Sequence, residues 1–234
     1  MKLLALLPLL ALPLTLVAAD SQPKTLLAER GKVLLSDDLN QAPDGKAWRA
    51  AKGKWEAADG AVRGAELAAD NHPGVIRHAL PFKDAVIQYD VKLDGAKMTT
   101  FSINDEKEHV ARVLLMPNAF RVQKDDHDHD GPDKAVVFGQ RAVKLAPGEW
   151  HTVVIEIVGD TMLATLDGRN ATFGSHELIA TQKANIGFTV SGESISLRNL
   201  RVWEAKPNPD WEKTKSTIPP APVPPAAPAK KPAA

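Results

Sequence analysis

The sequence predicts an all-β protein, built as a sandwich or barrel of antiparallel strands. Apolar and polar residues alternate with a period of two through most of residues 32–205, which is the pattern of half-buried strands. Turn sequences such as Gly159-Asp160 and Asp167-Gly168 separate these runs at hairpin spacing. Because no long amphipathic helical pattern and no internal repeat interrupts the series, we expect a single domain.

The alternation is clearest in two neighbouring runs, residues 85–93 (AVIQYDVKL) and 99–105 (TTFSIND). The positions predicted to face the core are Ala85, Ile87, Tyr89, Val91, Leu93, Phe101 and Ile103. The positions predicted on the opposite face are Gln88, Asp90, Lys92, Thr100, Ser102 and Asn104. Further strands are expected in HVARVLLM (109–116), FRVQK (120–124), the hairpin 150–173, ANIGFTV (184–190) and ISLRNLRVWEA (195–205).

Both ends of the chain differ in composition from this middle. A positive start, an apolar run and small residues near Ala19 predict a secretory signal peptide over residues 1–19, with a short membrane anchor as the alternative. Residues 20–31 form a lead-in, and residues 206–234 form a Pro/Ala/Lys-rich tail that is predicted to be disordered. We therefore expect an exported protein, periplasmic or extracellular, whose tail could contact an envelope polymer.

The composition excludes several classes of function. The chain has no cysteine, which rules out disulfides, thiolate metal sites and cysteine nucleophiles. Its 29 basic and 29 acidic residues give a formal net charge of zero, so the basic excess of nucleic-acid-binding proteins is missing. Once the signal peptide is removed, no stretch is apolar enough for stable insertion into a membrane.

The most distinctive stretch is KDDHDHDGPDK, residues 124–134, in which aspartate and histidine alternate. Asp126, Asp128 and Asp130 followed by Gly131 match D-x-D-x-D-G, the opening of a calcium loop. The bidentate Glu that closes such a loop in an EF-hand is missing, so a calcium site here would lie between strands.

Two other interpretations of this stretch stay open. His127 and His129 are two residues apart and could hold a zinc-like cation, provided that a third ligand comes from elsewhere in the chain. Alternatively, the stretch is a loop exposed to water, in which Lys124 and Lys134 soften the repulsion among the carboxylates.

Several polar residues interrupt predicted strands on the side away from the core. Arginines are the strongest candidates, because the guanidinium fork suits sugar hydroxyls and acidic sugars. His151 is a candidate general base, and a structural hydrogen bond at a strand edge is its alternative role. The candidate substrate-binding residues are Arg112, Arg121, Gln123, Gln88, Asn104 and Glu156.

Five blocks of sequence stand in an order that resembles the 3-keto-disaccharide hydrolase domain family. The blocks are LLSDDLN, WRAAKGKWEAADGAVRG, FKDAVIQYDVKLD, GEWHTVVIEIVGDTMLATLDGR and KANIGFTVSGESISLRNLRVWEA. Together they span nearly all of the chain between the signal peptide and the tail. The resemblance implies a concanavalin A-like jelly-roll sandwich of two antiparallel sheets, related in shape to laminarinases and laminin-G-like modules.

The resemblance also implies a carbohydrate-active protein that hydrolyses or eliminates glycosides oxidised at C3. A ketone at C3 acidifies the proton at C2, so a base and a Lewis acid can expel the anomeric substituent. On this interpretation Asp128, His129 and His151 would be catalytic, and a divalent cation such as calcium or zinc would assist.

The chain departs from the family pattern in residues 105–140, and it lacks the E-x-D-x-x-E motif of laminarinase-like relatives. Two alternatives therefore stay open, a non-catalytic carbohydrate-binding module and a structural protein of the envelope.

Overall fold

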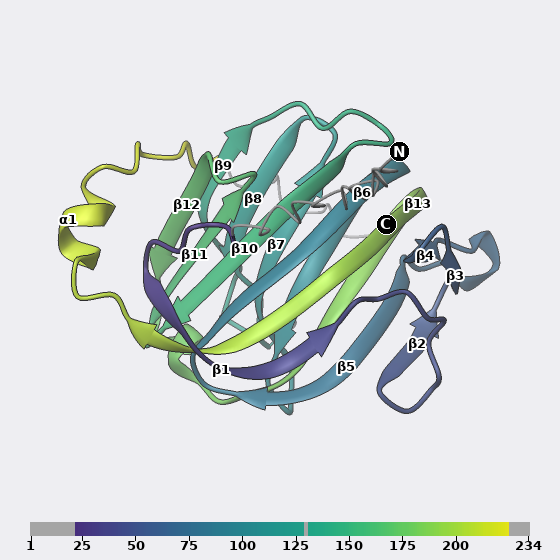
Figure 1. Cartoon of the computed structure of the whole chain (residues 1–234), viewed down its shortest axis with the longest axis horizontal. Helices are drawn as coiled ribbons and strands as arrows, with labels where there is room; N and C mark the ends of the chain where they lie inside the picture. Colours follow the sequence, from purple (N-terminus) through teal and green to yellow (C-terminus); the bar gives the residue numbers. More distant parts are fainter. Residues whose placement is uncertain (1–21, 129–130, 225–234) are drawn as a thin grey trace, which may run out of the picture.

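The computed structural model describes residues 22–128 and 131–224, and these fold almost entirely into antiparallel strands (Figure 1). The strands are β1 (Ala28–Asp37), β2 (Trp48–Lys52), β3 (Lys54–Ala58), β4 (Ala61–Ala65), β5 (Gly74–Phe82), β6 (Ala85–Asn104), β7 (His109–Met116), β8 (Ala119–Lys124), β9 (Val136–Ala142), β10 (Trp150–Val158), β11 (Thr161–Leu166), β12 (Asn170–Ser175) and β13 (Lys183–Pro207). The short helical elements are η1 (Ala68–Asp70), η2 (Glu177–Ala180) and α1 (Trp211–Lys215). None of the helices in this described part is long and apolar enough to cross a membrane.

Two long strands, β6 and β13, connect the two layers of the sandwich (Figure 1). The first half of β6 and the second half of β13 pair with each other and continue through β10, β11 and β12. The second half of β6 and the first half of β13 continue through β7, β8 and β9 on one side and through β5 and β2 on the other. We call these layers the β10 sheet and the β7 sheet.

The passage from one layer to the other depends on glycine. Gly95 in β6 and Gly192 in β13 have φ angles of +85° and +94°, which side chains rarely tolerate. The register between the two strands shifts at this point. A Cβ added to Gly192 would lie only 2.8 Å from the backbone nitrogen of Lys97, so the close approach also requires a residue without a side chain.

The hydrophobic core lies between the two sheets, as the alternation predicted. None of the seven predicted core positions in β6 exposes more than 2% of its surface, which confirms their assignment. Tyr89 stacks on Phe101 at 5.1 Å between ring centroids, and Phe188 of β13 meets both rings edge-on. The fold is an all-β jelly roll, and the predicted fold class is confirmed.

The observed strands extend beyond the predicted domain at both ends. β1 begins at Ala28, inside the predicted lead-in, and β13 ends at Pro207. The two strands pair with each other from Ala28 opposite Pro207 to Asp37 opposite Leu200. The predicted signal peptide, residues 1–19, lies outside the described residues.

The described part of the tail, residues 206–224, contacts β9 and β12 of the sandwich. Trp211 of α1 meets Phe173 of β12 at 5.2 Å. The guanidinium of Arg141 in β9 donates to the carbonyl oxygens of Pro219 and Pro220, and the backbone N–H of Gln140 donates to that of Pro222 at 2.7 Å. Prolines have no N–H of their own but keep their carbonyls, so an extended proline-rich segment can accept hydrogen bonds from a strand edge.

Removal of residues 209–234 should therefore lower the free energy of unfolding by about 2 kcal/mol, since several hydrogen bonds and the Trp211 contact are lost. Chemical denaturation of the truncated and full-length proteins measures the difference. Removal of residues 225–234 alone is the matched control and should leave stability unchanged. Equal stability of all three proteins would show that the contacts of the tail contribute nothing in solution.

Candidate functional site

The face of the β7 sheet that points away from the core carries a row of polar and small residues. Strand register sets Arg49, Arg77, Gly187, Ser102, Arg112 and Gln123 side by side across β2, β5, β13, β6, β7 and β8. Residues directly opposite on antiparallel strands point to the same side. We call these six residues the arginine row.

The middle of the arginine row consists of residues with small side chains. A Cβ added to Gly187 would lie 3.1 Å from Cγ of Arg77 and 3.2 Å from Oγ of Ser102. These distances confirm that Arg77 and Ser102 flank Gly187 on the same face. Gly187 and Ser102 therefore form a floor of small residues, with the long side chains of Arg77 and Arg112 on either side.

Arg112 is held in place by a largely buried carboxylate. Its Nε lies 2.6 Å from Oδ2 of Asp125, whose side chain is 7% exposed, whereas the side chain of Arg112 is 31% exposed. Gln123 Nε2 donates to the other oxygen of Asp125 at 3.2 Å. An arginine fixed through Nε keeps its Nη groups available to a ligand at the surface.

A small cavity of about 90 Å³ adjoins the row, lined by Arg77, Asn104, His109, Asn185 and the loop 105–108. His109 Nδ1 lies 2.5 Å from Oδ1 of Asn104, and Asn104 Nδ2 donates to Oδ1 of Asn185 at 2.7 Å. Burial lowers the pKa of His109 to about 4, and the positive charges of Arg112 and Arg77 contribute to this shift. The imidazole is thus neutral at pH 7.

The structure brings four of the six predicted substrate-binding residues to this face. Asn104, Arg112 and Gln123 lie in or beside the arginine row. Arg121 stands two residues before Gln123 on β8, and its Nε donates to Oε1 of Gln140 at 2.8 Å. Thr100, Ser102 and Asn104 share this face as predicted, but they are only 3–4% exposed because their side chains are short.

The other two predicted residues, Gln88 and Glu156, lie on the β10 sheet instead. Gln88 Oε1 accepts a hydrogen bond from Arg30 at 3.2 Å. Glu156 has no exposed surface, and its carboxylate accepts the backbone N–H groups of residues 26–28. The Glu156 carboxylate is therefore covered by the N-terminal segment in this structure, which the alternation of the strand could not show.

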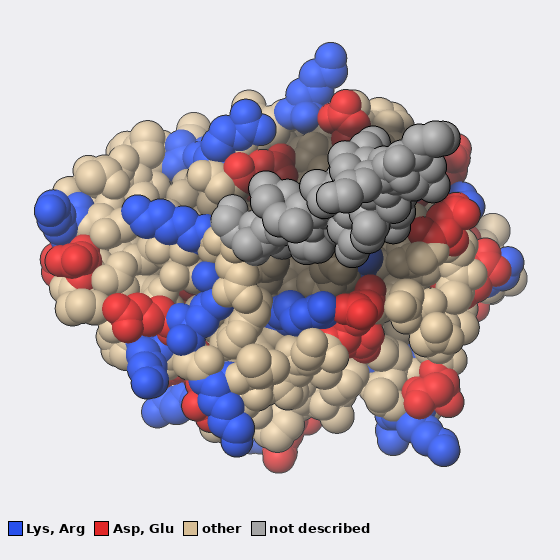
Figure 2. All heavy atoms as spheres, in the orientation of Figure 1, with Lys and Arg blue, Asp and Glu red and all other residues tan. Residues whose placement is uncertain are grey.

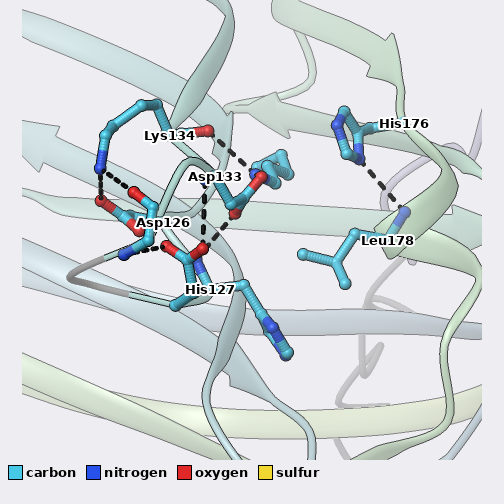
Figure 3. A network of polar contacts seen from close by, with 9 residues as sticks. Asp126, His127, Asp133, Lys134, His176 and Leu178 are labelled. Carbon is cyan, nitrogen blue, oxygen red and sulfur yellow. Dashed lines mark hydrogen bonds and ion pairs between the residues drawn. The ribbon is translucent and has the colours of Figure 1, made fainter.

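The described residues of the Asp/His loop that follows β8 include Asp126, His127, Asp133 and Lys134, which lie close together in one network of polar contacts (Figure 3). The Lys124 ammonium, which is fully buried, pairs with Asp133 and donates to the carbonyl oxygen of Lys134 at 2.9 Å. Asp133 also accepts the backbone N–H of His127 at 2.9 Å. Hydrogen bonding from Lys124 holds the pKa of the Asp133 carboxyl below its usual value.

The described carboxylates of this loop do not fit a cation site. Asp128 accepts the backbone N–H groups of Gly131 and Asp133, Asp126 lies 3.8 Å from the Lys134 ammonium, and the ring of His127 points to Asp105 at 2.7 Å. Among the described residues, no three His, Asp or Glu side chains gather as a metal would require. His129 and Asp130, the other two residues predicted to bind metal, lie outside the described residues.

We accordingly expect chelation to have no effect on the protein. The melting temperature measured with and without EDTA should agree, because Asp126, His127 and Asp128 already have partners within the protein. Addition of Ca²⁺ or Zn²⁺ after EDTA is the matched arm. A melting temperature that falls with EDTA and returns with either cation would restore the metal-loop interpretation.

His151, predicted as a general base, is 7% exposed and lies at the start of β10, away from the arginine row. Its Nδ1 lies 2.8 Å from Oδ2 of Asp167, whose other oxygen accepts the backbone N–H of Thr152. Asp167 has a positive φ of 52° in the turn between β11 and β12. The pair therefore fixes a hairpin turn, the structural alternative that the sequence also allowed.

A hollow of about 490 Å³ lies over the β10 sheet, but several of the polar groups that line it pair with one another. Asp90 accepts from Thr152, Arg198 and Asn199, and Arg198 also covers the ring of Trp150 at 4.0 Å. Figure 2 shows that basic and acidic side chains are interspersed over the face that it views. Groups that satisfy one another offer little to a ligand, so the arginine row is the stronger candidate.

Among the residues at this site that the sequence analysis missed, one could have been found from the sequence and two could not. Arg77 interrupts the apolar strand β5 as Arg112 interrupts β7, and the same criterion would have selected it. His109 and Asn185 lie at strand ends, where alternation gives no direction. Their meeting at one cavity depends on the pairing of β6 with both β7 and β13.

The fold is shared with carbohydrate-binding modules and glycosidases. The chain is similar to carbohydrate-binding module CBM66 from Bacillus subtilis, at 14% identity and a TM-score of 0.56, over 68% of this chain and 96% of that one. It is also similar to the CBM2 module of the evolved Dit of Lactobacillus casei BL23 phage J-1, at 14% identity and a TM-score of 0.60, over 76% and 98% of the two chains. A third similar structure is SCLam, a non-specific endo-β-1,3(4)-glucanase of family GH16, at 12% identity and a TM-score of 0.54, over 77% and 96%.

Identities this low show the fold alone. No family model matches the chain, and no curated protein matches it. The link to the 3-keto-disaccharide hydrolase domain family therefore rests on the order of the five sequence blocks.

Proposed function

We propose that the protein is an exported carbohydrate-binding jelly roll whose ligand lies across the arginine row. The observation that carries the proposal is the arrangement of Arg77 and Arg112 on either side of the Gly187–Ser102 floor. Guanidinium groups over a low, polar floor can donate several hydrogen bonds to the hydroxyls of one sugar ring. Carbohydrate-binding modules among the structures of the same fold support this choice of ligand.

The cavity beside the row makes the proposed binding site deeper next to Arg77. Asn104, His109 and Asn185 form a chain of hydrogen bonds along its wall. This chain fixes the orientation of each side chain before a ligand binds, which reduces the entropy lost on binding. A hydroxyl or hydroxymethyl group of the ligand would enter this cavity while the ring lies over Gly187 and Ser102.

The experiment that tests this proposal replaces the guanidinium group of Arg112 but keeps the positive charge. Arg112→Lys should weaken binding of the best glycan found on an array by about tenfold, because lysine keeps the charge but cannot donate two parallel hydrogen bonds. Titration calorimetry measures the change, and Gln88→Ala on the β10 sheet is the control that should bind as wild type. Equal affinity of both variants would place the ligand elsewhere, and binding to no glycan would remove the proposal.

Cleavage of 3-keto-glycosides is the second candidate function, and His109 is the observation that favours it. A neutral imidazole beside Arg77 and Arg112 can accept the C2 proton of a 3-keto sugar while the arginines stabilise the resulting enolate. Incubation with a 3-keto-glucoside, followed by chromatography, tests this role. Release of the aglycone by wild type but not by His109→Gln would support catalysis, and recovery of intact substrate would leave a binding protein.

A further inference from the structure

The arginine row holds more positive charge than the strands around it neutralise. Arg49 of β2 stands directly opposite Arg77 of β5, and both are exposed. Within the described residues, neither forms a salt bridge of 4.0 Å or less with a carboxylate, and neither donates a side-chain hydrogen bond. Like charges directly opposite each other on neighbouring strands are destabilising, so this pair weakens the free protein.

Two more guanidinium groups lie on the same face. Arg112 follows across the floor of Gly187 and Ser102. Arg121 lies on the neighbouring strand β8, two residues from Gln123, and is bonded to the neutral amide of Gln140. Asp125, directly after the end of β8, is paired with Arg112. Of these four arginines, Arg112 is the one paired with a carboxylate among the described residues, so the row carries excess positive charge although the chain as a whole has a formal net charge of zero.

Resting on the proposed function, we propose that the ligand is an anionic saccharide, one that carries a carboxylate or sulfate group. The anionic group lies between Arg49, Arg77 and Arg112 and accepts paired hydrogen bonds from their guanidinium forks. Neutral sugars bind such forks as well, but they would not remove the repulsion between Arg49 and Arg77. An anionic group removes that repulsion and forms charge-assisted hydrogen bonds, which are about twice as strong as neutral ones.

The cavity beside the arginine row, which Arg77 also lines, sets the orientation of the ligand. The loop 105–108 lines the cavity with Asp105, Glu106 and Glu108, and Lys107 is its one basic residue. A second anionic group would be repelled at this end. The acidic unit therefore binds over the arginines, while the adjoining unit at the cavity is neutral or presents its hydroxyls.

The experiment compares saccharides that differ only in charge. Oligogalacturonate is measured against its methyl ester, alginate against carboxyl-reduced alginate, and dextran sulfate against dextran, each by titration with wild-type protein. We expect at least one acidic member to bind about tenfold or more tightly than its neutral counterpart, and to weaken as salt is raised. The first two pairs identify a carboxylate ligand, and the third identifies a sulfate ligand.

Variants separate a specific site from general attraction of polyanions. Arg49→Gln/Arg77→Gln should lose the preference for the acidic member, whereas Lys32→Gln/Lys206→Gln, which removes two exposed charges from β1 and β13, should keep it. Thermal melting confirms that both proteins are folded. The double arginine variant should be at least as stable as wild type, because a like-charge pair is removed.

The outcomes distinguish the two proposals. Tight binding of a neutral saccharide with no preference for its acidic form would overturn the anionic ligand and leave the carbohydrate-binding function in place. An acidic preference that both double variants lose equally would reduce the effect to net charge and also overturn the inference. Failure to bind any saccharide, charged or neutral, on these pairs and on a glycan array would overturn the proposed function itself.

Discussion

Replacement of Asp133 by alanine should destabilise the protein by about 3 kcal/mol, although Asp133 belongs to a loop between strands. The reason is that Asp133 pairs with a buried lysine. The Lys124 side chain has no exposed surface, and Asp133 is the carboxylate with which its ammonium is paired. Removal of one member of such a pair leaves a charge buried without compensation, which costs far more than the loss of an exposed ion pair.

A second substitution tests this explanation. In the Lys124→Met/Asp133→Ala double variant no charge is left buried, so most of the lost stability should return. Asp126→Ala is the matched control within the same loop, because Asp126 and Lys134 are both partly exposed and 3.8 Å apart. Its effect should stay within about 0.5 kcal/mol.

Urea denaturation of the four proteins measures these differences. The pKa of Asp133 is lowered in the folded state, so its contribution is present above the unfolded value of 3.8 and is lost as pH falls below it. The gap between wild type and Asp133→Ala should therefore narrow in acid. A gap of less than about 1 kcal/mol at pH 7 would mean that water reaches the Lys124 ammonium.

The fold was predictable because the alternation in β6, β10 and β13 is long and regular. The positions predicted in β6 are buried as expected, and β13 alternates in the same way between the points where its register with β6 shifts. The alternation does not show to which of the two sheets a given part of a strand belongs. The passage of β6 between layers at Gly95 puts Gln88 and Asn104 on different sheets, although both were assigned to one ligand face.

Residues of the candidate site could be predicted where a charged side chain interrupts an apolar strand. They could not be predicted where their position depends on which strands pair and in what register. Arg112 and Arg121 were found because β7 and β8 are otherwise apolar. The opposition of Arg49 and Arg77 depends on the register between β2 and β5, which no local pattern specifies. The Asp/His loop shows the converse, since Asp133, which belongs to neither predicted metal motif, neutralises the buried Lys124, and no local pattern predicts that contact.

Glu156→Ala should cost about 3 kcal/mol or more, because one buried carboxylate holds the N-terminal end of the described chain. Its Oε2 accepts the N–H groups of Leu26, Leu27 and Ala28 at 2.9, 2.7 and 2.8 Å. Without the carboxylate these donors are left unpaired beside Trp203 and Val154, in a cluster of buried apolar residues. Glu156→Gln is the matched variant, whose amide oxygen can take the place of Oε2, and its loss should be about 1 kcal/mol.

The dependence on pH separates the charge of Glu156 from its hydrogen bonds. Burial raises the pKa of Glu156 above 4.5 in the folded protein, against the opposing effect of the three backbone N–H groups. The unfolded chain therefore releases this proton first, and the contribution of the group to stability is lost as pH rises above 4.5 through the folded pKa. Glu156→Gln does not titrate, so its deficit relative to wild type should be largest near pH 4 and should shrink toward pH 7. A deficit that grows with pH would show instead that the three N–H donors stabilise the ionised carboxylate more than burial penalises it.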